Sequence, residues 1–378
     1  MAFADVFSEL MKRPTPVMAR FARLLGENGG QSLEALARRS QALTRQHFGR
    51  TMRLFVPLYV SNECVNNCTY CGFSRDAPIL RTTLTVAQVV REARHLHAQG
   101  FRHILLVAGE HPKFVSDGYL QNCLDALKSF IPTLAIEVGP MEDAQYAEIV
   151  RHGAEGLIAY QETYHRPTYQ ELHTAGPKRD FDWRLNCPER AYAGGFRRIG
   201  IGALFGLAGW QHEALALCAH LEYLYKHCWK AQFTVAFPRM RPYAGNYQYQ
   251  PDPAHSLPDV VLVRLIAVFR LVFPQVGIVM STREPAPLRD SLAGLGVTHM
   301  SAGARTEPGG YTGAGGDDLH LTVKGRRVEL KQKTGCEKAT EQFQINDLRS
   351  AEEVANMLRL KHLDPVWKDW DEVLLAGC

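Results

Sequence analysis

The run YVSNECVNNCTYCGF, residues 59–73, contains Cys64, Cys68 and Cys71 in the spacing C-x3-C-x2-C. It directly follows an apolar stretch, residues 54–60, which is typical of a buried strand. Three soft thiolates on one short loop can bind an iron–sulfur cluster. A cubane cluster held by three cysteines keeps one iron open for a small molecule. The loop therefore predicts an open-iron cluster placed just after the first strand.

The three cysteines could instead pack as small hydrophobic residues, or they could form part of a zinc knuckle. Zinc prefers four protein ligands, and no cysteine or histidine follows the loop at the spacing of a zinc ribbon. The cluster is therefore favoured. A simple iron–sulfur electron carrier and a zinc-stabilised scaffold stay open as functions of other classes.

Composition indicates one sizeable enzyme. The chain has 378 residues, 46% hydrophobic and 22% charged, enough for one large barrel or two domains. Its net charge of +4 is too small and too evenly spread to indicate nucleic-acid binding. Residues 1–13 lack the apolar core of a signal peptide, and no apolar run is long enough to span a membrane. The nine cysteines, an odd number, suit a reducing cytoplasm better than a disulfide framework.

Strand and helix patterns alternate along the chain after a helical start at residues 1–50. Eight apolar runs indicate strands, at residues 54–60, 103–108, 133–138, 157–160, 198–203, 232–237, 276–281 and 297–301. Helical patterns separate them, at residues 86–99, 119–130, 143–152, 188–194, 212–227, 258–272 and 287–294. This order predicts an α/β fold in which a parallel sheet closes as a (β/α)8 TIM-type barrel. A doubly wound open sheet is the second candidate.

Three parts of the chain are expected from these patterns. Residues 1–50 form an N-terminal helical extension, and residues 51–305 form the barrel. Residues 306–378 form a C-terminal extension with a helix and, in the glycine- and lysine-rich residues 313–335, a loop or small hairpin.

Candidate site residues gather where predicted strands end, as a barrel requires. Gly109 and Glu110 follow the second strand, and Gln161 and Glu162 follow the fourth. A glycine lets a ligand approach the backbone, and a carboxylate accepts hydrogen bonds from an ammonium group. Outside this context, Glu110 would be interpreted as a solvated acid in a loop.

Further candidates belong to the fifth and seventh strands. Gly200 and Gly202 lie in the fifth strand, where small residues would let an adenine pack against the strand. They do not form the G-x-G-x-x-G motif of a dinucleotide-binding site, because Gly202 lies within the strand and this strand is late in the chain. Arg283 follows the seventh strand, and a planar guanidinium there suits a bidentate grip on a carboxylate. The alternative is an ion pair between Arg283 and its neighbour Glu284.

The cysteine motif resembles that of the radical S-adenosylmethionine (SAM) superfamily, C-x3-C-x-aromatic-C, with Tyr70 as the aromatic residue. Ala108-Gly109-Glu110 is similar to the superfamily's Gly-Gly-Glu element, which holds the SAM amino group. The resemblance implies a [4Fe-4S] cluster whose open iron binds SAM, and an electron from the cluster that splits SAM to a 5′-deoxyadenosyl radical. By the same resemblance, Arg184 would bind the SAM carboxylate; a surface arginine on a helix is the alternative.

Longer runs resemble one family in the superfamily, the 2-iminoacetate synthases of thiamine thiazole biosynthesis. They are YQETYH at residues 160–165, FRRIGIGA at 196–203, FPRMRP at 237–242, STRE at 281–284 and PVWKDWD at 365–371. The resemblance implies cleavage of the Cα–Cβ bond of L-tyrosine to 2-iminoacetate and p-cresol, while SAM becomes 5′-deoxyadenosine and methionine. It also implies a flavodoxin- or ferredoxin-type electron donor and a thiazole synthase as partner. Arg283 would then hold the tyrosine carboxylate.

The resemblance extends to other aromatic amino acid lyases. A tyrosine lyase that matures iron-only hydrogenase shares the Gln-Glu-Thr-Tyr-His element, but it carries a second cluster on a C-terminal cysteine set. This chain has only Cys336 and Cys378 in that region, far apart, so a second cluster is not expected. Tryptophan lyases are a further alternative. The remaining cysteines are expected to be buried structural residues: Cys123, Cys187, Cys218 and Cys228.

Overall fold

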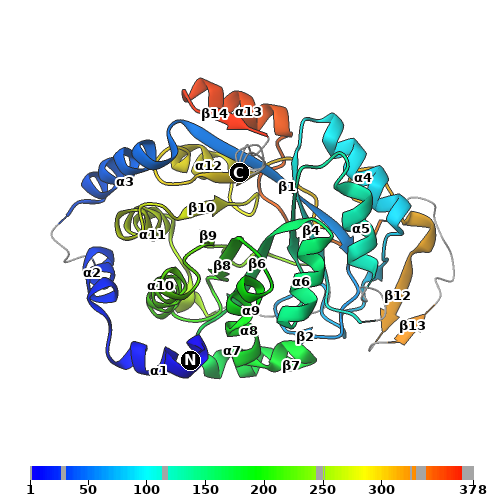
Figure 1. The fold of residues 1–378 in the computed structure, drawn as a ribbon, viewed down its shortest axis with the longest axis horizontal. Helices are drawn as coiled ribbons and strands as arrows, with labels where there is room; N and C mark the ends of the chain where they lie inside the picture. The colour runs from blue at the N-terminus through cyan, green and yellow to red at the C-terminus, as the bar shows by residue number, and fades with distance from the viewer. Residues whose placement is uncertain are drawn as a thin grey trace.

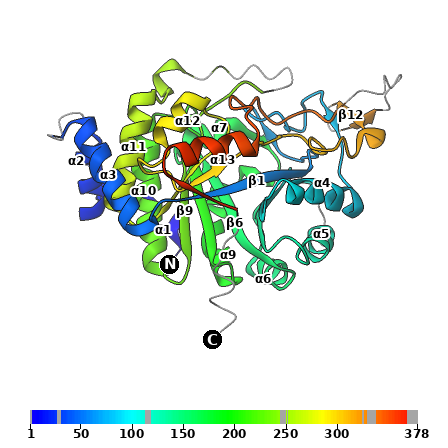
Figure 2. The same ribbon diagram turned by 90° about the horizontal axis from the view of Figure 1, so that it is seen from above.

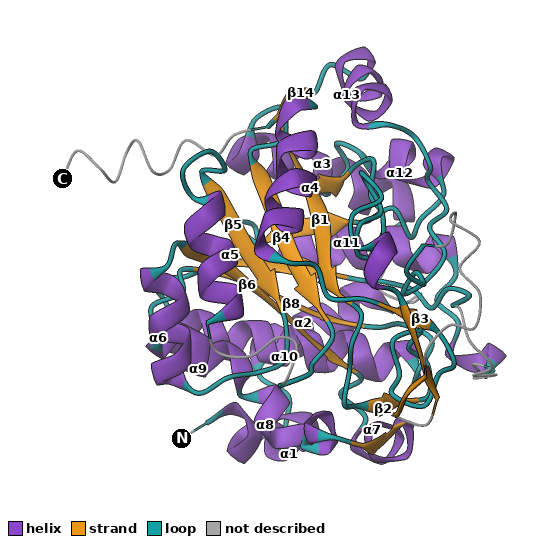
Figure 3. Cartoon of the chain, turned by 90° about the vertical axis from the view of Figure 1, so that its right-hand side faces the viewer, coloured by secondary structure: helices purple, strands orange, loops and turns teal. Residues whose placement is uncertain are grey.

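A closed parallel barrel forms the centre of the molecule (Figures 1 and 3). The computed structural model describes residues 2–26, 31–112, 118–243, 250, 252–323, 326–328 and 338–367. The barrel strands are β1 (Thr51–Ser61), β4 (His103–Ala108), β5 (Thr133–Glu137), β6 (Ala154–Glu162), β8 (Arg198–Ala203), β9 (Gln232–Ala236), β10 (Gly277–Met280) and β11 (His299–Ser301). Each strand pairs in parallel with the next, and β11 returns to β1, with Leu54 opposite Met300. The predicted barrel is confirmed, and the open-sheet alternative is wrong.

Helices cover the outside of the barrel, one or more between successive strands. They are α4 (Val86–Ala98), α5 (Tyr119–Leu127), α6 (Asp143–Arg151), α9 (Cys187–Ala193), α10 (Trp210–His227), α11 (Asp259–Val272), α12 (Ala286–Leu292) and α13 (Ala351–Leu360). Local signals fix several starts: Thr85 caps α4 through a capping box with Gln88, and Ser350 does the same for α13 with Glu353. The long connection after β6 also contains α7 (Arg166–Leu172), β7 (His173–Ala175), η1 (Pro177–Arg179) and α8 (Phe181–Leu185), which the sequence did not predict.

Three N-terminal helices lie along one side of the barrel (Figure 1). They are α1 (Phe3–Lys12), α2 (Pro16–Leu25) and α3 (Leu33–Phe48), and they pack on α10 and α11. The ring of Phe3 stacks on His220 at a centroid distance of 4.3 Å, and Phe21 meets Phe269 edge-on at 4.8 Å. The expected helical start is present as α1, α2 and α3; residues 27–30, between α2 and α3, lie outside the described residues.

The C-terminal part adds two small pieces of sheet. The strands β12 (His320–Val323) and β13 (Arg326–Val328) form an antiparallel hairpin, which pairs with β3 (Leu80–Arg81). The hairpin expected in residues 313–335 is therefore present where the structure describes that segment. Downstream of α13, β14 (Asp364–Val366) pairs in parallel with the start of β1 (Figure 2). The remaining elements are β2 (Asn67–Cys68), η2 (Pro253–His255) and η3 (Gly316–Asp318).

The division into three parts at residues 50 and 305 stays a prediction. Of the helices in the described part of the chain, none combines the length and the apolar character that crossing a bilayer requires.

Candidate active site

The cysteine loop, residues 62–74, is closed at its base by the buried side chain of Arg81. The Arg81 guanidinium donates hydrogen bonds to the carbonyl oxygens of Asn62 (2.5 Å), Phe73 (3.1 Å) and Ser74 (2.6 Å). Because one planar group binds carbonyls at both ends of the loop, the loop is held in a fixed relation to β3.

The three thiols of the loop lie close enough to influence one another. Cys71 packs with Cys64 in one apolar cluster and with Cys68 in another. Burial, and then the neighbouring Cys71 thiol, raise the pKa of Cys64, and burial raises the pKa of Cys68. Among the described residues, no three His, Cys, Asp or Glu side chains are arranged to hold one metal ion.

Gly109 and Glu110 lie directly against the cysteine loop. A Cβ atom on Gly109 would stand 2.2 Å from the carbonyl oxygen of Glu63, so only glycine fits without moving the backbone. The Glu110 carbonyl accepts a hydrogen bond from the backbone N–H of Val65 at 2.7 Å, and its carboxylate accepts one from the Asn66 side chain at 2.7 Å. The segment after β4 therefore supports the loop as well as offering a carboxylate.

Glu162 stands at the end of β6 in a left-handed conformation, with φ of 70°. Such a conformation is uncommon for a residue other than glycine and aims the side chain away from the regular strand direction. The carboxylate pairs with Lys178 Nζ at 2.7 Å and with Arg184 at 3.5 Å. Burial opposes ionisation, but the Lys178 and Arg184 charges hold the pKa of Glu162 below its usual value. Arg184 also donates through Nε to the Tyr160 carbonyl at 2.7 Å.

Two other predicted residues, Tyr70 and Gln161, lie beside the charged group formed by Glu162, Lys178 and Arg184. The ring of Tyr70 is buried, its hydroxyl pairs with His173 Nε2 at 2.8 Å, and Lys178 Nζ stands 5.8 Å from its centroid. The side chain of Gln161 is buried, and its Oε1 has no hydrogen-bond partner among the described residues. A buried amide oxygen without a partner is costly unless a ligand donates to it.

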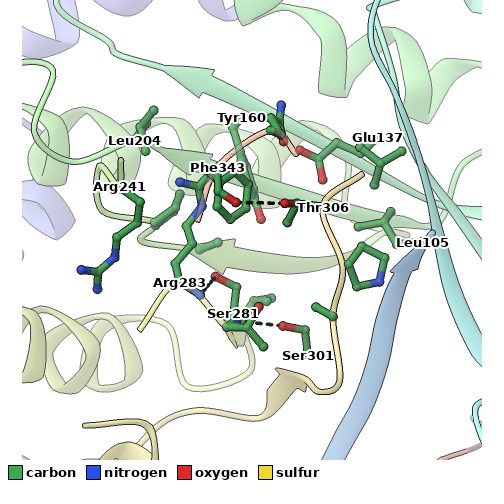
Figure 4. A pocket seen from close by; sticks show the side chains of 18 of the residues that line it. Leu105, Glu137, Tyr160, Leu204, Arg241, Ser281, Arg283, Ser301, Thr306 and Phe343 are labelled. Carbon is green, nitrogen blue, oxygen red and sulfur yellow. Dashed lines mark hydrogen bonds between the residues drawn. The ribbon is translucent and has the colours of Figure 1, made fainter. Parts of the chain in front are cut away.

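A cavity opens at the carboxyl ends of the strands (Figure 4). Cys71 and Tyr70 form part of its wall, and Glu162 and Lys178 form another part. Across from them the wall comes from the segments after β9 and β10 and from the C-terminal extension, through Pro238, Met240, Ser281, Arg283, Gln342 and Phe343. The cavity therefore has both the cysteine loop and Arg283 in its wall, as the barrel prediction requires.

Arg283 enters this cavity from the segment after β10. Its guanidinium carbon lies 3.3 Å from the centre of the Phe343 ring, in a cation–π arrangement. The alternative pairing with Glu284 is wrong: Glu284 binds Arg239 and Arg241 instead. Among the described residues, Arg283 forms no ion pair, so its fork is left to face the cavity.

Gly200 and Gly202 do not line this cavity. Gly200 lines a second cavity of about 390 Å³ at the amino ends of the strands, together with Arg53, His103 and Arg198. A Cβ on Gly202 would stand 2.7 Å from the Ala236 carbonyl oxygen and 2.8 Å from the Tyr160 ring. The need for small residues in β8 thus comes first from packing between strands, and a contact of either glycine with adenine stays a prediction.

Several cavity residues were not singled out from the sequence, among them Glu137, Lys178, Gln342 and Phe343. Lys178 follows a Gly-Pro turn in a connection without a strong pattern, and Glu137 ends a strand whose tip showed no motif. Gln342 donates to Cys71 Sγ at 3.8 Å and accepts from the Tyr59 hydroxyl at 2.8 Å, while Phe343 packs on Arg283. Glu137 could have been found from the rule that barrel chemistry follows strand ends; the Gln342 and Phe343 contacts are long-range and leave no local signal.

The residues present fit an iron–sulfur cluster and SAM. The three thiols share one loop beside the cavity, and Gly109 lets the next segment touch that loop. Gln161 is not among the residues that line the cavity, so its contact with a cofactor stays a prediction.

Comparison with known proteins agrees with this geometry. Residues 58–219 match the Radical SAM superfamily, and residues 236–364 match the Biotin and Thiamin Synthesis associated domain. The chain is 40% identical over 352 residues to the 2-iminoacetate synthase of Escherichia coli strain K12, covering 93% of this chain and 86% of that protein. The 2-iminoacetate synthase of Salmonella typhimurium gives the same identity and coverage. The solved structure of the FeFe-hydrogenase maturase HydG from Carboxydothermus hydrogenoformans superposes with a TM-score of 0.79 at 30% identity, over 97% of this chain and 80% of that one.

Proposed function

The chain belongs to the 2-iminoacetate synthase family of the radical SAM superfamily, and from this we propose that it cleaves L-tyrosine to 2-iminoacetate and p-cresol. It is a radical SAM carbon–carbon lyase. The observation that carries the proposal is the 40% identity to curated 2-iminoacetate synthases over 93% of the chain. The cysteine loop and Arg283, which line one cavity, supply the physical basis.

The cluster would be held by Cys64, Cys68 and Cys71. When bound, the cluster and SAM supply the radical that removes a hydrogen atom from the substrate. The chain's own task is to fix the loop, which Arg81 and Gly109 do, and to keep water and stray hydrogen donors out. A cluster on a loop with both ends bound has little freedom to shift relative to the barrel.

We assign SAM to the side of the cavity formed by β4, β6 and the connection after β6. Glu110 would accept hydrogen bonds from its amino group, and Arg184 would attract its carboxylate. Gln161 and Glu162 would bind polar atoms of the nucleoside, and Tyr70 would close the site beside the cluster. The lowered pKa of Glu162 supports its role, because an ionised carboxylate accepts hydrogen bonds from hydroxyl or amino groups.

We assign tyrosine to the opposite side, with its carboxylate on Arg283. An arginine fork binds a carboxylate in two hydrogen bonds and so fixes orientation as well as position. The Phe343 ring holds the guanidinium plane in place. An anchored substrate is needed because hydrogen transfer requires the reacting atoms to be about 3–3.5 Å apart.

A role in hydrogenase maturation is the second candidate, since HydG is similar in structure. The sequence argues against it, because Cys336 and Cys378 cannot form a second cluster site by themselves.

We further propose a flavodoxin- or ferredoxin-type reductant, a thiazole synthase that receives 2-iminoacetate, and a cytoplasmic location. The described cysteines are all free thiols, which suits a reducing compartment.

The test is anaerobic incubation of the reconstituted protein with SAM, a reductant and one amino acid at a time. L-tyrosine is expected to give p-cresol, 2-iminoacetate (trapped as glyoxylate after hydrolysis) and 5′-deoxyadenosine in comparable amounts. Carbon monoxide or cyanide in quantity would support the hydrogenase role instead. Faster turnover of tryptophan than of tyrosine would also reject the proposal.

A further inference from the structure

Glu137 is the last residue of β5, and its carboxyl group enters the cavity that Arg283 enters from another wall (Figure 4). Three carboxylate side chains line this cavity: Glu137, Glu162 and Glu284. Glu162 is paired with Lys178, and Glu284 is paired with Arg239. Among the described residues, only Glu137 of the three has no ion pair.

Glu137 is half-buried, and among the described residues it forms no ion pair of its own. Burial, and then the charge of Glu162 on β6, raise the pKa of Glu137 to about 7, although Arg283 opposes the shift. The cations Arg184 and Lys178 lower this pKa to a smaller extent than Arg283 does, and both of them pair with Glu162.

Two phenols complete the ring of titratable groups around Glu137. Tyr59 on β1 and Tyr160 on β6 both line the cavity, and burial raises the pKa of each hydroxyl well above its usual value. Both therefore stay neutral through the physiological range. Glu137 is the group here whose charge changes near neutral pH.

An α-amino acid presents an ammonium group one carbon away from its carboxylate. If Arg283 binds the carboxylate, the ammonium needs an acceptor on the same side of the cavity. Glu137 interacts electrostatically with Arg283 and has no cation of its own among the described residues. The pair Arg283 and Glu137 therefore matches the two charges of a zwitterion.

We propose that Glu137 binds the ammonium group of the tyrosine substrate and accepts one of its protons before hydrogen-atom removal. This inference rests on the proposed function. In the step, one N–H bond of the ammonium breaks, its electron pair stays on nitrogen, and the proton forms an O–H bond on Glu137. The substrate becomes a neutral amine, the carboxylate becomes a carboxylic acid, and no electron is gained or lost.

The reason for such a step lies in the chemistry of the N–H bond. Removing a hydrogen atom from an ammonium group would leave a radical cation on nitrogen. Removing it from a neutral amine leaves a neutral aminyl radical. Its unpaired electron pairs with one electron of the breaking Cα–Cβ bond to form the C=N bond of 2-iminoacetate, and the other electron leaves on the benzyl carbon. A base with a pKa near 7 is suited to this transfer, because a large share of it is ionised near neutral pH and it takes up a proton readily.

Binding gives the first test, independent of turnover. In the cluster-loaded protein, Glu137→Gln is expected to weaken L-tyrosine binding about ten- to a hundredfold, as for a lost charge-assisted hydrogen bond. Binding of 3-(4-hydroxyphenyl)propionate, which lacks the amino group, is expected to change less than about threefold, within the usual context dependence. Glu352→Gln, at an exposed site on α13, is the matched control and should leave both affinities unchanged. Equal losses for both ligands, or no loss for either, would overturn the inference.

The pH profile gives the second test. Wild-type kcat/KM for tyrosine is expected to fall as pH drops through about 7, because protonation removes the acceptor. The Glu137→Gln enzyme should lose this fall of kcat/KM at low pH, and its rate should drop about a hundredfold or more. Glu137→Asp should restore part of the rate and part of the pH dependence. A Glu137→Gln enzyme with wild-type rate and profile would refute the inference while leaving the proposed function intact. A wild-type enzyme that makes no p-cresol at any pH would instead refute the proposed function, and the inference with it.

Discussion

Arg283 and Phe343 meet from segments that lie 60 positions apart in sequence, and their contact of 3.3 Å sets one wall of the cavity. Arg283 was predictable, because it directly follows a strong strand pattern in a barrel. Its partner was not, since a cation–π contact between distant segments leaves no periodic or local signal. The same division holds at Glu162, which sequence placed in the site, and Lys178, which it did not.

Replacing Arg283 by lysine tests the substrate anchor. Lys keeps the charge but loses the fork, so L-tyrosine affinity is expected to fall about ten- to a hundredfold. SAM cleavage without p-cresol should increase, because loosely held tyrosine leaves the radical to react elsewhere. Calorimetry and product ratios measure both effects. Arg45→Lys, at an exposed position on α3, is the control; unchanged affinity and coupling in Arg283→Lys would show that Arg283 is structural.

Replacing the cysteines tests the cluster. Alanine at Cys64, Cys68 or Cys71 leaves two thiolates on the loop, too few to hold a cubane, so iron content and SAM cleavage should be lost. Cys123→Ala, which changes a buried residue of α5, should keep a full cluster. Iron and sulfide analysis, together with electron paramagnetic resonance, distinguishes the variants of the cysteine loop from Cys123→Ala. A full cluster signal and full turnover in any variant of the loop would contradict the assignment.

At the scale of elements, the site is made by segments that follow strands and are braced by their neighbours. The eight strands and seven of the helices that flank them were predictable within a few residues, because buried strands are apolar and capping signals are local. The connection after β6 was not: it turns through α7, β7, η1 and α8, whose short lengths give little periodicity. That connection carries Lys178, which explains why this partner of Glu162 was missed, whereas Arg184 was expected only from the family resemblance.

Gly109→Ala tests the support of the cysteine loop by the segment after β4. The added Cβ would stand 2.2 Å from the Glu63 carbonyl oxygen, so the loop or the segment must move. Cluster occupancy and SAM affinity are expected to fall substantially, with little change in the thermal midpoint. At Gly209 a Cβ would meet nothing within 4 Å, so Gly209→Ala should behave as wild type. Equal behaviour of the two variants would show that Gly109 does not support the loop.

Glu213 on α10 links a helix to the end of β6. It is fully buried, it accepts a hydrogen bond from the backbone N–H of Tyr164 at 2.8 Å, and burial raises its pKa to about 7. A carboxyl whose pKa rises on folding stabilises the fold at acidic pH, and this contribution is lost as pH rises from about 4.5 to 7. For this group the loss is about 3 kcal/mol.

Glu213→Gln should therefore flatten the dependence of stability on pH. The difference in free energy of unfolding between pH 5 and pH 8 should shrink by about 1–3 kcal/mol relative to wild type. Denaturant titrations at both pH values measure it, with exposed Glu352→Gln as the control. An undiminished difference would mean that Glu213 does not change its protonation on folding.

At the scale of the whole molecule, closure of the barrel brings two distant segments to one cavity. They are the cysteine loop, which follows the first barrel strand, and Arg283, which follows the seventh. Closure depends on the pairing of β1 with β11, which are separated by most of the chain, so sequence predicts the strand count but not the contact. The strand count was still enough to predict where the site lies. Eight alternating strand–helix units favour a barrel, and the carboxyl ends of all barrel strands lie on one face. The C-terminal extension could not be placed in this way, yet it supplies Gln342 and Phe343 to the cavity.

We propose above all that this cavity positions the amino group of tyrosine for hydrogen-atom removal. The most direct measurement is the mass of 5′-deoxyadenosine formed in D2O, where the hydrogens on nitrogen and on the phenol oxygen of tyrosine exchange and its carbon-bound hydrogens do not. We predict one deuterium in the 5′-deoxyadenosine, formed in step with p-cresol, and none when tyrosine labelled only on carbon reacts in ordinary water. Unlabelled 5′-deoxyadenosine in D2O, or label transferred from carbon, would contradict this positioning.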